Sequence, residues 1–340
     1  MQGTILVATA GQGVVRSSDD GRTWARTPLD QALEFDSVVR CIAVAPDRPE
    51  VVYAGAEVGL VRSDDAGYSW TRVDGPFDGK QLWTLAIDPH DSDFLLVGSG
   101  APDRAYVWRS TDGGTTWAEL PPRIPEHCAG VSKPRILTST VDPVDPAQLW
   151  FGIEEGGLWH STDRGDSWER LDHAPDTRPG VVTNSDVHAV VVHPGEPKTH
   201  LVVTVNALWV SRDGGRQWKR SIARDEFGYR YARTVSALAD GKTLLFACGD
   251  GTPGTKTRIF RSEDFGDTWQ ETKFDVEPNS TVWGFGVHPA DPALVFAGTK
   301  YGHLLRSVDG GLSWTKEWRE FSEITAVAWT PAVANPANPH

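Results

Sequence analysis

The residues of this chain that could do chemistry stand near the starts of seven strand-like segments. Six of the segments end in a turn that contains proline, and the seventh ends in Asp240-Gly241. Alignment on these turns gives one row of side chains and a second row two residues earlier. The first row is Arg40, Trp83, Leu137, His188, Thr234, Trp283 and Thr325, and the second is Val38, Gln81, Arg135, Asp186, Ala232, Thr281 and Glu323. Because strand side chains two residues apart share a face, both rows point the same way.

The two rows contain two carboxylates, Asp186 and Glu323, which are the predicted catalytic residues of an acid–base pair. One register is open, because a slip of one residue in the segment of Thr234 brings Arg233 inward instead. Loops on the same side add Lys300 and Tyr301. The predicted ligand-binding residues are Arg40, Trp83, Arg135, His188, Trp283, Arg233, Tyr231, Lys300 and Tyr301.

A repeated eight-residue box positions these segments. The pattern Ser-x-Asp-x-Gly-x-(Thr/Ser/Gln)-Trp occurs seven times, and its tryptophans follow one another at 45 to 51 residues. The boxes open at Ser17, Ser63, Ser110, Ser161, Ser211, Ser262 and Ser307. In each box, Asp can accept hydrogen bonds from the backbone that follows, and Gly supplies a positive φ. Seven such units with short strands between them predict a β-propeller.

The strands missing at one end of the chain are present at the other end. The first box lacks an inner strand before it, and the last inner segment, Glu323 to Thr330, has no strands after it. We therefore predict an all-β fold: a single seven-bladed β-propeller of four-stranded antiparallel blades, closed by pairing the C-terminal strand with the N-terminal strands. Residues 1–331 form the propeller, and we expect residues 332–340 to be a disordered tail.

Composition limits the partners. The formal net charge of −13 argues against nucleic acid or an anionic membrane surface as a partner. Three cysteines form no disulfide framework, and no signal peptide or membrane span is evident, so we expect a cytoplasmic monomer. His127 and Cys128 are adjacent zinc donors without a second pair at metal-ligand spacing, so we expect no metal and no cofactor.

The seven boxes resemble the Asp-box (BNR) repeats of sialidases, xyloglucanase-type glycoside hydrolases, the sortilin ectodomain and photosystem II assembly factor propellers. The resemblance covers nearly the whole chain and implies the propeller fold, with the boxes on the face away from the usual site. Two departures matter. The Arg-Ile-Pro motif of the six-bladed sialidases does not occur before the first box here. The xyloglucanases pair two propellers around a cleft, and this chain has one.

Three functions remain open from the sequence. The first is a site of the glycoside hydrolase type in the central funnel, which binds or acts on a carbohydrate or another small polar ligand through Trp83, Trp283 and the Asp186–Glu323 pair. The second is a non-catalytic propeller that binds a partner protein. The third is a sialidase-like hydrolase in which Arg40, Arg135 and Arg233 hold a carboxylate and Tyr229 or Tyr231 is the nucleophile. The long segments 118–135 and 219–233 could form lids over the site.

Overall fold

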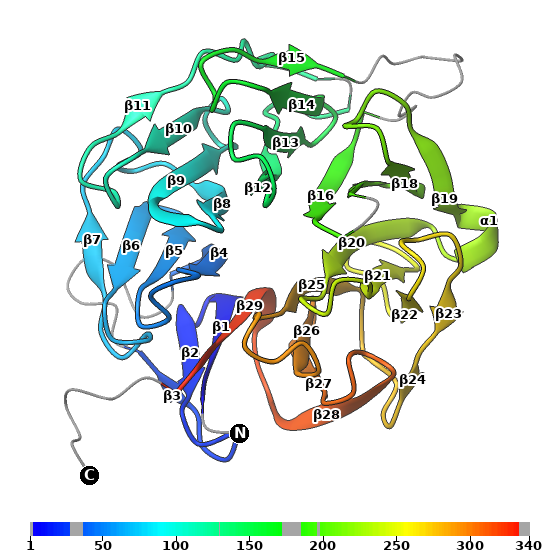
Figure 1. Ribbon diagram of the computed structural model, residues 1–340. Coiled ribbons are helices and arrows are strands. Elements are labelled where there is room, and N and C mark those ends of the chain that lie inside the picture. Colours follow the sequence, from blue (N-terminus) through cyan, green and yellow to red (C-terminus); the bar gives the residue numbers. More distant parts are fainter. Residues whose placement is uncertain (1–2, 28–36, 129, 172–184, 196–197, 333–340) are drawn as a thin grey trace.

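The strands form seven sheets around a central channel, as Figure 1 shows. This computed structural model describes residues 3–27, 37–128, 130–171, 185–195 and 198–332. We number the blades from the one that contains the N-terminal strands. Each blade runs from an inner strand at the channel to an outer strand at the rim, and the predicted all-β seven-bladed propeller is confirmed.

The strand bounds follow the chain. Blade 1 contains β29 (Glu323–Pro331), β1 (Gly3–Ala10), β2 (Val14–Ser17) and β3 (Ala25–Arg26); blade 2 contains β4 (Val39–Val44), β5 (Val52–Ala56), β6 (Gly59–Ser63) and β7 (Thr71–Val73). Blade 3 contains β8 (Leu82–Asp88), β9 (Asp91–Ser99), β10 (Val107–Ser110) and β11 (Ala118–Glu119); blade 4 contains β12 (Ile136–Val141), β13 (Leu149–Ile153), β14 (Gly157–Ser161) and β15 (Glu169–Arg170). Blade 5 contains β16 (Val187–His193), β17 (Thr199–Thr204), β18 (Ala207–Ser211) and β19 (Lys219–Ala223); blade 6 contains β20 (Tyr231–Ala237), β21 (Leu244–Gly249), β22 (Thr257–Ser262) and β23 (Gln270–Glu271). Blade 7 contains β25 (Val282–Gly286), β26 (Val295–Thr299), β27 (His303–Ser307) and β28 (Ser313–Glu320).

Blade 7 differs from the predicted four-stranded pattern. A fifth strand, β24 (Lys273–Phe274), crosses from blade 6 and pairs in parallel with β28. Phe274 packs there against the core cluster that contains Trp314. This crossover ties the outer edges of blades 6 and 7 together.

The closure of the ring is the one predicted. β29 pairs with β1 antiparallel from Gly3↔Pro331 to Ala10↔Glu323, so the two ends of the described chain share blade 1. The predicted tail lies outside the described residues, apart from Ala332, and stays a prediction.

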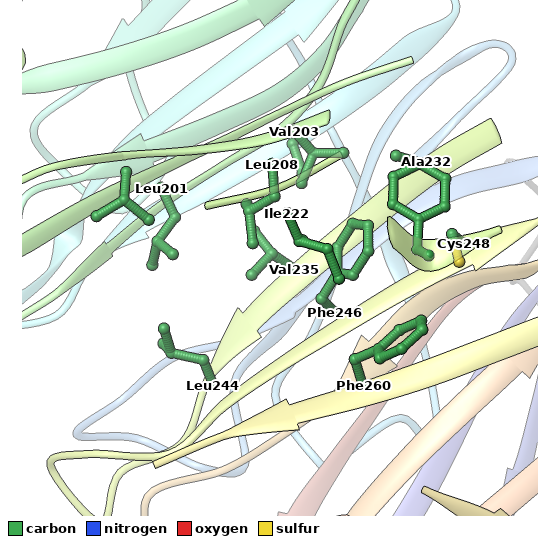
Figure 2. Close-up of a cluster of buried hydrophobic side chains, with 13 residues drawn as sticks. Leu201, Val203, Leu208, Ile222, Ala232, Val235, Leu244, Phe246, Cys248 and Phe260 are labelled. Atoms are coloured by element: carbon green, nitrogen blue, oxygen red, sulfur yellow. The ribbon is translucent and has the colours of Figure 1, made fainter. Parts of the chain in front are cut away.

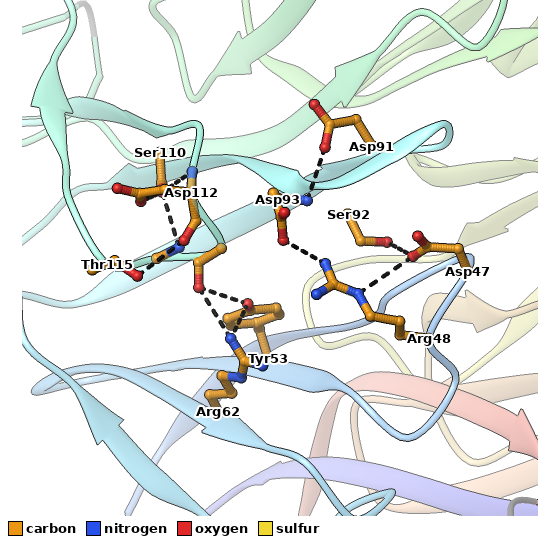
Figure 3. A network of polar contacts seen from close by, with 12 residues as sticks. Asp47, Arg48, Tyr53, Arg62, Asp91, Ser92, Asp93, Ser110, Asp112 and Thr115 are labelled. Carbon is orange, nitrogen blue, oxygen red and sulfur yellow. Dashed lines mark hydrogen bonds and ion pairs between the residues drawn. The ribbon is translucent and has the colours of Figure 1, made fainter.

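The boxes are hydrogen-bonded turns on the rim side of the third strands. In blade 3, Ser110 Oγ donates to Asp112 Oδ1 over 2.8 Å and accepts from the Gly114 N–H over 2.9 Å. The carboxylate of Asp112 also accepts from the N–H and the hydroxyl of Thr116. Figure 3 shows this turn beside the Arg62–Tyr53 contact of blade 2. Each box therefore satisfies its own backbone donors in the turn.

Arginines tie several blades to the box of the next. Arg62 donates to the Gly113 carbonyl over 3.2 Å, and Arg109 donates to the Arg164 carbonyl over 2.5 Å. Arg306 closes the circle from blade 7 to Asp20 in blade 1 over 2.6 Å. These contacts join neighbouring blades, and the bond from Arg306 to Asp20 joins the last blade to the first.

Apolar clusters fill the spaces between blades. Figure 2 shows the cluster between blades 5 and 6, where Leu208 and Ile222 of blade 5 meet Phe246 and Phe260 of blade 6. Phe246 is fully buried in this cluster. Burial of a side chain of this size stabilises the fold by about 1.5–3 kcal/mol.

Segment 219–233 contains the helix α1 (Arg224–Phe227) at the rim. Phe227 is fully buried and its ring centroid lies 5.6 Å from that of Phe246, so the helix is packed onto blade 6. Among the described residues, no helix has the length and apolar character needed to cross a membrane.

Candidate functional site

Each inner strand has a β-bulge at the same place, and the bulged residues face the channel. The pairing of each inner strand with its neighbour skips one residue. The skipped residues are Arg40, Trp83, Leu137, His188, Arg233, Trp283 and Thr325, and all of them line one cavity at the channel. A bulge turns a side chain out of the regular alternation of the strand. We call these residues the bulge ring.

The bulge ring settles the register that the sequence left open. Arg233 takes the position in blade 6 for which the alignment had chosen Thr234, because the bulge lies between Ala232 and Thr234. Thr234 lines the cavity as well.

Glycines in the second strands allow the blades to converge here. A Cβ atom at Gly98 would lie 2.9 Å from Ile136 Cβ of the next blade, and one at Gly152 would lie 2.3 Å from Val187 Cγ1. Both glycines are paired with the residue that follows a bulge, Thr84 and Thr138 respectively. Only a residue without a side chain fits where neighbouring inner strands approach so closely.

The cavity has a volume of about 660 Å³ and a strongly charged lining. From the second predicted row, Arg135, Asp186 and Glu323 line it, whereas Val38, Gln81, Ala232 and Thr281 do not. Lys300, Tyr231 and Glu154 complete the set of ionisable and aromatic groups described below. Tyr301, the remaining predicted residue, is 55% exposed and is not among the lining residues.

Each of the three carboxylates among the described lining residues has its own basic partner. Arg135 Nη1 lies 2.8 Å from both carboxylate oxygens of Glu154. Lys300 Nζ contacts Glu323 Oε1. His188 Nε2 lies 3.1 Å from Asp186 Oδ2.

The order of the blades does not give the ion-pair partners. Arg135 lies one blade before Asp186 and Arg40 one blade after Glu323, so blade order alone makes each arginine a candidate partner of that carboxylate. In the structure, loop residues between second and third strands supply Glu154 and Lys300 as the actual partners. Glu154 follows directly after the end of β13 at Ile153, and this place on the loop that faces the channel was the signal available in the sequence.

His188 is held at both ring nitrogens. Nδ1 lies 2.7 Å from the Ala232 carbonyl oxygen, which can only accept a hydrogen bond, so Nδ1 carries a proton. Nε2 faces the Asp186 carboxylate. Burial acts to raise the pKa of Asp186, but the hydrogen bond and the charge of His188 outweigh burial and lower it.

Glu154 behaves in the opposite way. Burial raises the pKa of its carboxyl group, and the charge of Asp186 adds to that rise although Arg135 opposes it. The cavity thus holds two carboxylates, Asp186 and Glu154, whose pKa values are moved in opposite directions.

The two bulge-ring tryptophans carry cations on their rings. Arg40 Cζ lies 4.2 Å and Arg135 Cζ 4.8 Å from the ring centroid of Trp83. Across the channel, Arg233 Cζ lies 3.7 Å and Lys300 Nζ 4.1 Å from that of Trp283. These cation–π contacts leave less indole face for a sugar ring than the sequence suggested.

Tyr231 extends the second aromatic group. Its ring stacks on Trp283 with centroids 6.3 Å apart, and it contacts the His188 imidazole at 4.8 Å. The long segments contribute little else to the cavity. Of the described residues in 118–135 only Arg135 lines it, and of 219–233 only Tyr231 and Arg233 do.

No group of three or more His, Cys, Asp or Glu side chains in the described ranges could hold a metal ion. His127 Nδ1 instead contacts the Ser132 carbonyl at 2.6 Å. Cys41 lines the cavity, but burial raises the pKa of its thiol to about 12, which does not suit a nucleophile.

Comparisons with known proteins agree with the repeat and the fold. The BNR-Asp box repeat model matches residues 259–272. The chain is similar to a xyloglucanase of Hypocrea jecorina, 26% identical over 274 residues that cover 69% of this chain and 32% of that protein. The chain spans about a third of the length of the first curated relatives it matches.

Two solved structures share the propeller at low identity. YCF48 from Cyanidioschyzon merolae has a TM-score of 0.58 at 16% identity, covering 89% of this chain and 96% of that one. YCF48 bound to D1 peptide has a TM-score of 0.54 at 15% identity, covering 83% and 82%. The resemblance to Asp-box propellers is therefore confirmed for the repeat and the fold.

Proposed function

We propose that this protein binds a carbohydrate in the central cavity, in a site of the glycoside hydrolase type. The observation that carries the proposal is the cavity of about 660 Å³, lined by indole, phenol, guanidinium and carboxylate groups. Its volume is in the range of about 300–1,000 Å³ typical of small-molecule sites. Charged planar groups can hydrogen-bond adjacent hydroxyls, and ring edges pack against C–H groups. The similarity to a xyloglucanase supports the same class of ligand.

A hydrolytic reaction in this site would use Asp186 and Glu323. Asp186 suits the general base, because its pKa is lowered in spite of burial. Glu323 would have to donate a proton to the leaving group, and it is already paired with the Lys300 ammonium. Carbohydrate binding is therefore better supported than hydrolysis. An assay of glycoside hydrolysis tests the second.

The test is calorimetric titration of the protein with oligosaccharides, neutral and acidic, from plant and microbial polysaccharides. We expect Trp283→Ala to weaken binding of the ligand found by roughly tenfold or more, because it removes the ring that holds Arg233, Lys300 and Tyr231 in place. Trp318→Ala is the matched control, since Trp318 is 66% exposed on β28 and does not line the cavity. Failure of the wild-type protein to bind any member of the panel would overturn the proposal.

A partner protein is the second candidate. The cations of the cavity would suit an acidic peptide, and the similar YCF48 fold is known bound to D1 peptide. The titration separates the two classes when a panel of acidic and neutral peptides is run beside the oligosaccharides.

The sialidase-like alternative has less support. Arg135, one of its three arginines, is paired with Glu154. Tyr229 lies beside Arg258, whose Cζ is 4.8 Å from its ring centroid, and is not among the cavity-lining residues, which leaves Tyr231 as the candidate nucleophile.

A further inference from the structure

The positive charges of the cavity outnumber its carboxylates. Among the described residues, four side chains with fixed or ammonium charge line it, Arg40, Arg135, Arg233 and Lys300, against the three carboxylates of Glu154, Asp186 and Glu323. Arg135, Lys300 and His188 each contact one of these carboxylates. In the described part of the chain, Arg40 and Arg233 contact no carboxylate, although the overall net charge of the protein is −13.

Arg233 is the more buried of the two, with 8% of its surface exposed. Among the described residues it has no hydrogen-bond or ion-pair partner, and its Nε is buried without one. Its contact is with the Trp283 ring at 3.7 Å, which fixes the plane of the guanidinium but satisfies none of its N–H groups. The charges of Asp186 and Glu154 act on this guanidinium without satisfying its N–H groups, and because a buried guanidinium without a hydrogen-bonded anion is costly, an anion supplied by a ligand would stabilise it.

Arg40 repeats this arrangement on the other side of the channel. It lies over Trp83 at 4.2 Å, and its Nε is also buried without a partner in the described part of the chain. The inner strands β4 and β20, which carry Arg40 and Arg233, are separated by β29 and β25 in one direction and by β8, β12 and β16 in the other. The two guanidiniums therefore face the cavity from nearly opposite blades.

The positive charges in the cavity also repel one another. Burial lowers the pKa of Lys300, and the charges of Arg233 and Arg40 lower it further although Glu323 opposes them. Burial and the charge of Arg135 likewise lower the pKa of Arg40, against the opposing effect of Glu323. An anion in the cavity would relieve this repulsion.

We propose that the carbohydrate bound in this cavity is an acidic one, a uronic acid oligosaccharide whose carboxylates pair with Arg40 and Arg233. A planar carboxylate can accept two parallel hydrogen bonds from one guanidinium, and two guanidiniums on opposite blades suit two carboxylates on one chain of sugars. The inference rests on the proposed function, because it names the class of carbohydrate.

The test compares one oligosaccharide in two charge states. Tetragalacturonate and its fully methyl-esterified form have the same rings, and only the first has carboxylates. We expect the acid to bind at least roughly tenfold more tightly than the ester, with affinity that falls as salt is raised. Equal binding of both forms would overturn this inference and leave the proposed function intact. Binding of neither form, nor of a sulfated oligosaccharide, while an acidic peptide binds, would overturn both.

The variants connect the effect to the two arginines. Arg233→Gln and Arg40→Gln should each weaken binding of tetragalacturonate roughly ten- to a hundredfold and weaken binding of the ester much less. Arg104→Gln, outside the cavity lining, is the matched control. Arg233→Lys keeps the charge and should recover part of the affinity, which separates loss of charge from a fault in folding. Tetragalacturonate affinity that is the same in wild type and in both Gln variants would refute the assignment.

Discussion

Glu323 has two candidate roles, one catalytic and one structural, because it pairs with Lys300. Glu323 is a candidate acid by position, yet it also neutralises a half-buried ammonium. Glu323→Gln leaves Lys300 without its partner, and we expect a loss of about 1–3 kcal/mol in the free energy of unfolding. The double variant Lys300→Met/Glu323→Gln should recover much of that loss. Thermal melts and hydrolysis of aryl glycosides, measured on the same samples, check both roles. Lost turnover with an unchanged melting temperature would show that Glu323 is catalytic rather than structural.

At the scale of residues, the sequence predicted which side chains line the cavity better than it predicted their ion-pair partners. Arg40, Trp83, His188 and Trp283 line the cavity as the row alignment expected. The ion pairs differ because Glu154 and Lys300 reach the cavity from loops. No alignment of inner strands can find partners that come from other segments. The catalytic and ligand-binding roles stay predictions.

At the scale of elements, the turns that end the inner strands use two kinds of acceptor. Asp88 Oδ1 accepts from the His90 N–H, and Asp142 Oδ1 accepts from the Val144 N–H. In the equivalent turns His193 Nδ1 accepts from the Gly195 N–H over 2.9 Å, and His288 Nδ1 accepts from the Ala290 N–H over 3.1 Å. A histidine can do this only while Nδ1 is unprotonated.

These histidines predict a loss of stability in mild acid. Burial lowers the pKa of both His193 and His288. A lowered pKa means that the unfolded chain takes up protons first, so stability is full above the unfolded value of about 6.5 and falls as pH decreases below it. We expect the melting temperature to fall from pH 7 to pH 5. The double variant His193→Asp/His288→Asp copies Asp88 and Asp142 and should show a smaller fall over that interval. An identical pH profile for both proteins would contradict this account.

The bulges explain one error and several successes of the alignment. In six inner strands the bulged residue stands six residues before the turn proline, so counting back from proline finds the right side chain. In blade 6 the count began at Asp240, and the row slipped from Arg233 to Thr234. Period-two reasoning cannot detect an extra residue in a strand. The glycines at positions such as Gly98 and Gly152 were the signal, because glycine within a strand often marks a bulge or a close approach.

At the scale of the whole molecule, the repeats determined the blade number and the incomplete ends predicted the closure. The crossover strand β24 had no such signal, since a two-residue parallel pairing follows from the distance between neighbouring blades rather than from a local pattern. The excess of positive side chains in the cavity also could not be predicted from the net charge, because the net charge is a sum over the whole chain.

The closure by β29 makes the final prediction. β29 supplies the inner strand of blade 1 and buries Ile324, Val327 and Trp329 against β1 and blade 7. Deletion from Glu323 onward should expose the edge of β1 and remove this core, so we expect the melting transition of the whole domain to fall or disappear. Deletion of residues 333–340 keeps all of β29 and is the control, with an expected unchanged melting temperature.

A rearranged chain makes the closure test stricter. Because Pro331 pairs with Gly3, the end of β29 lies beside the start of β1, and residues 323–332 can be moved in front of Gly3 through a short glycine linker. That permuted chain keeps every strand of blade 1 and joins β29 to β1 as a hairpin. We expect it to regain the cooperative melting that the long deletion loses, as followed by circular dichroism. A long deletion that melts like the full chain, or a permuted chain that stays unfolded, would show that β29 does not close the ring in this way.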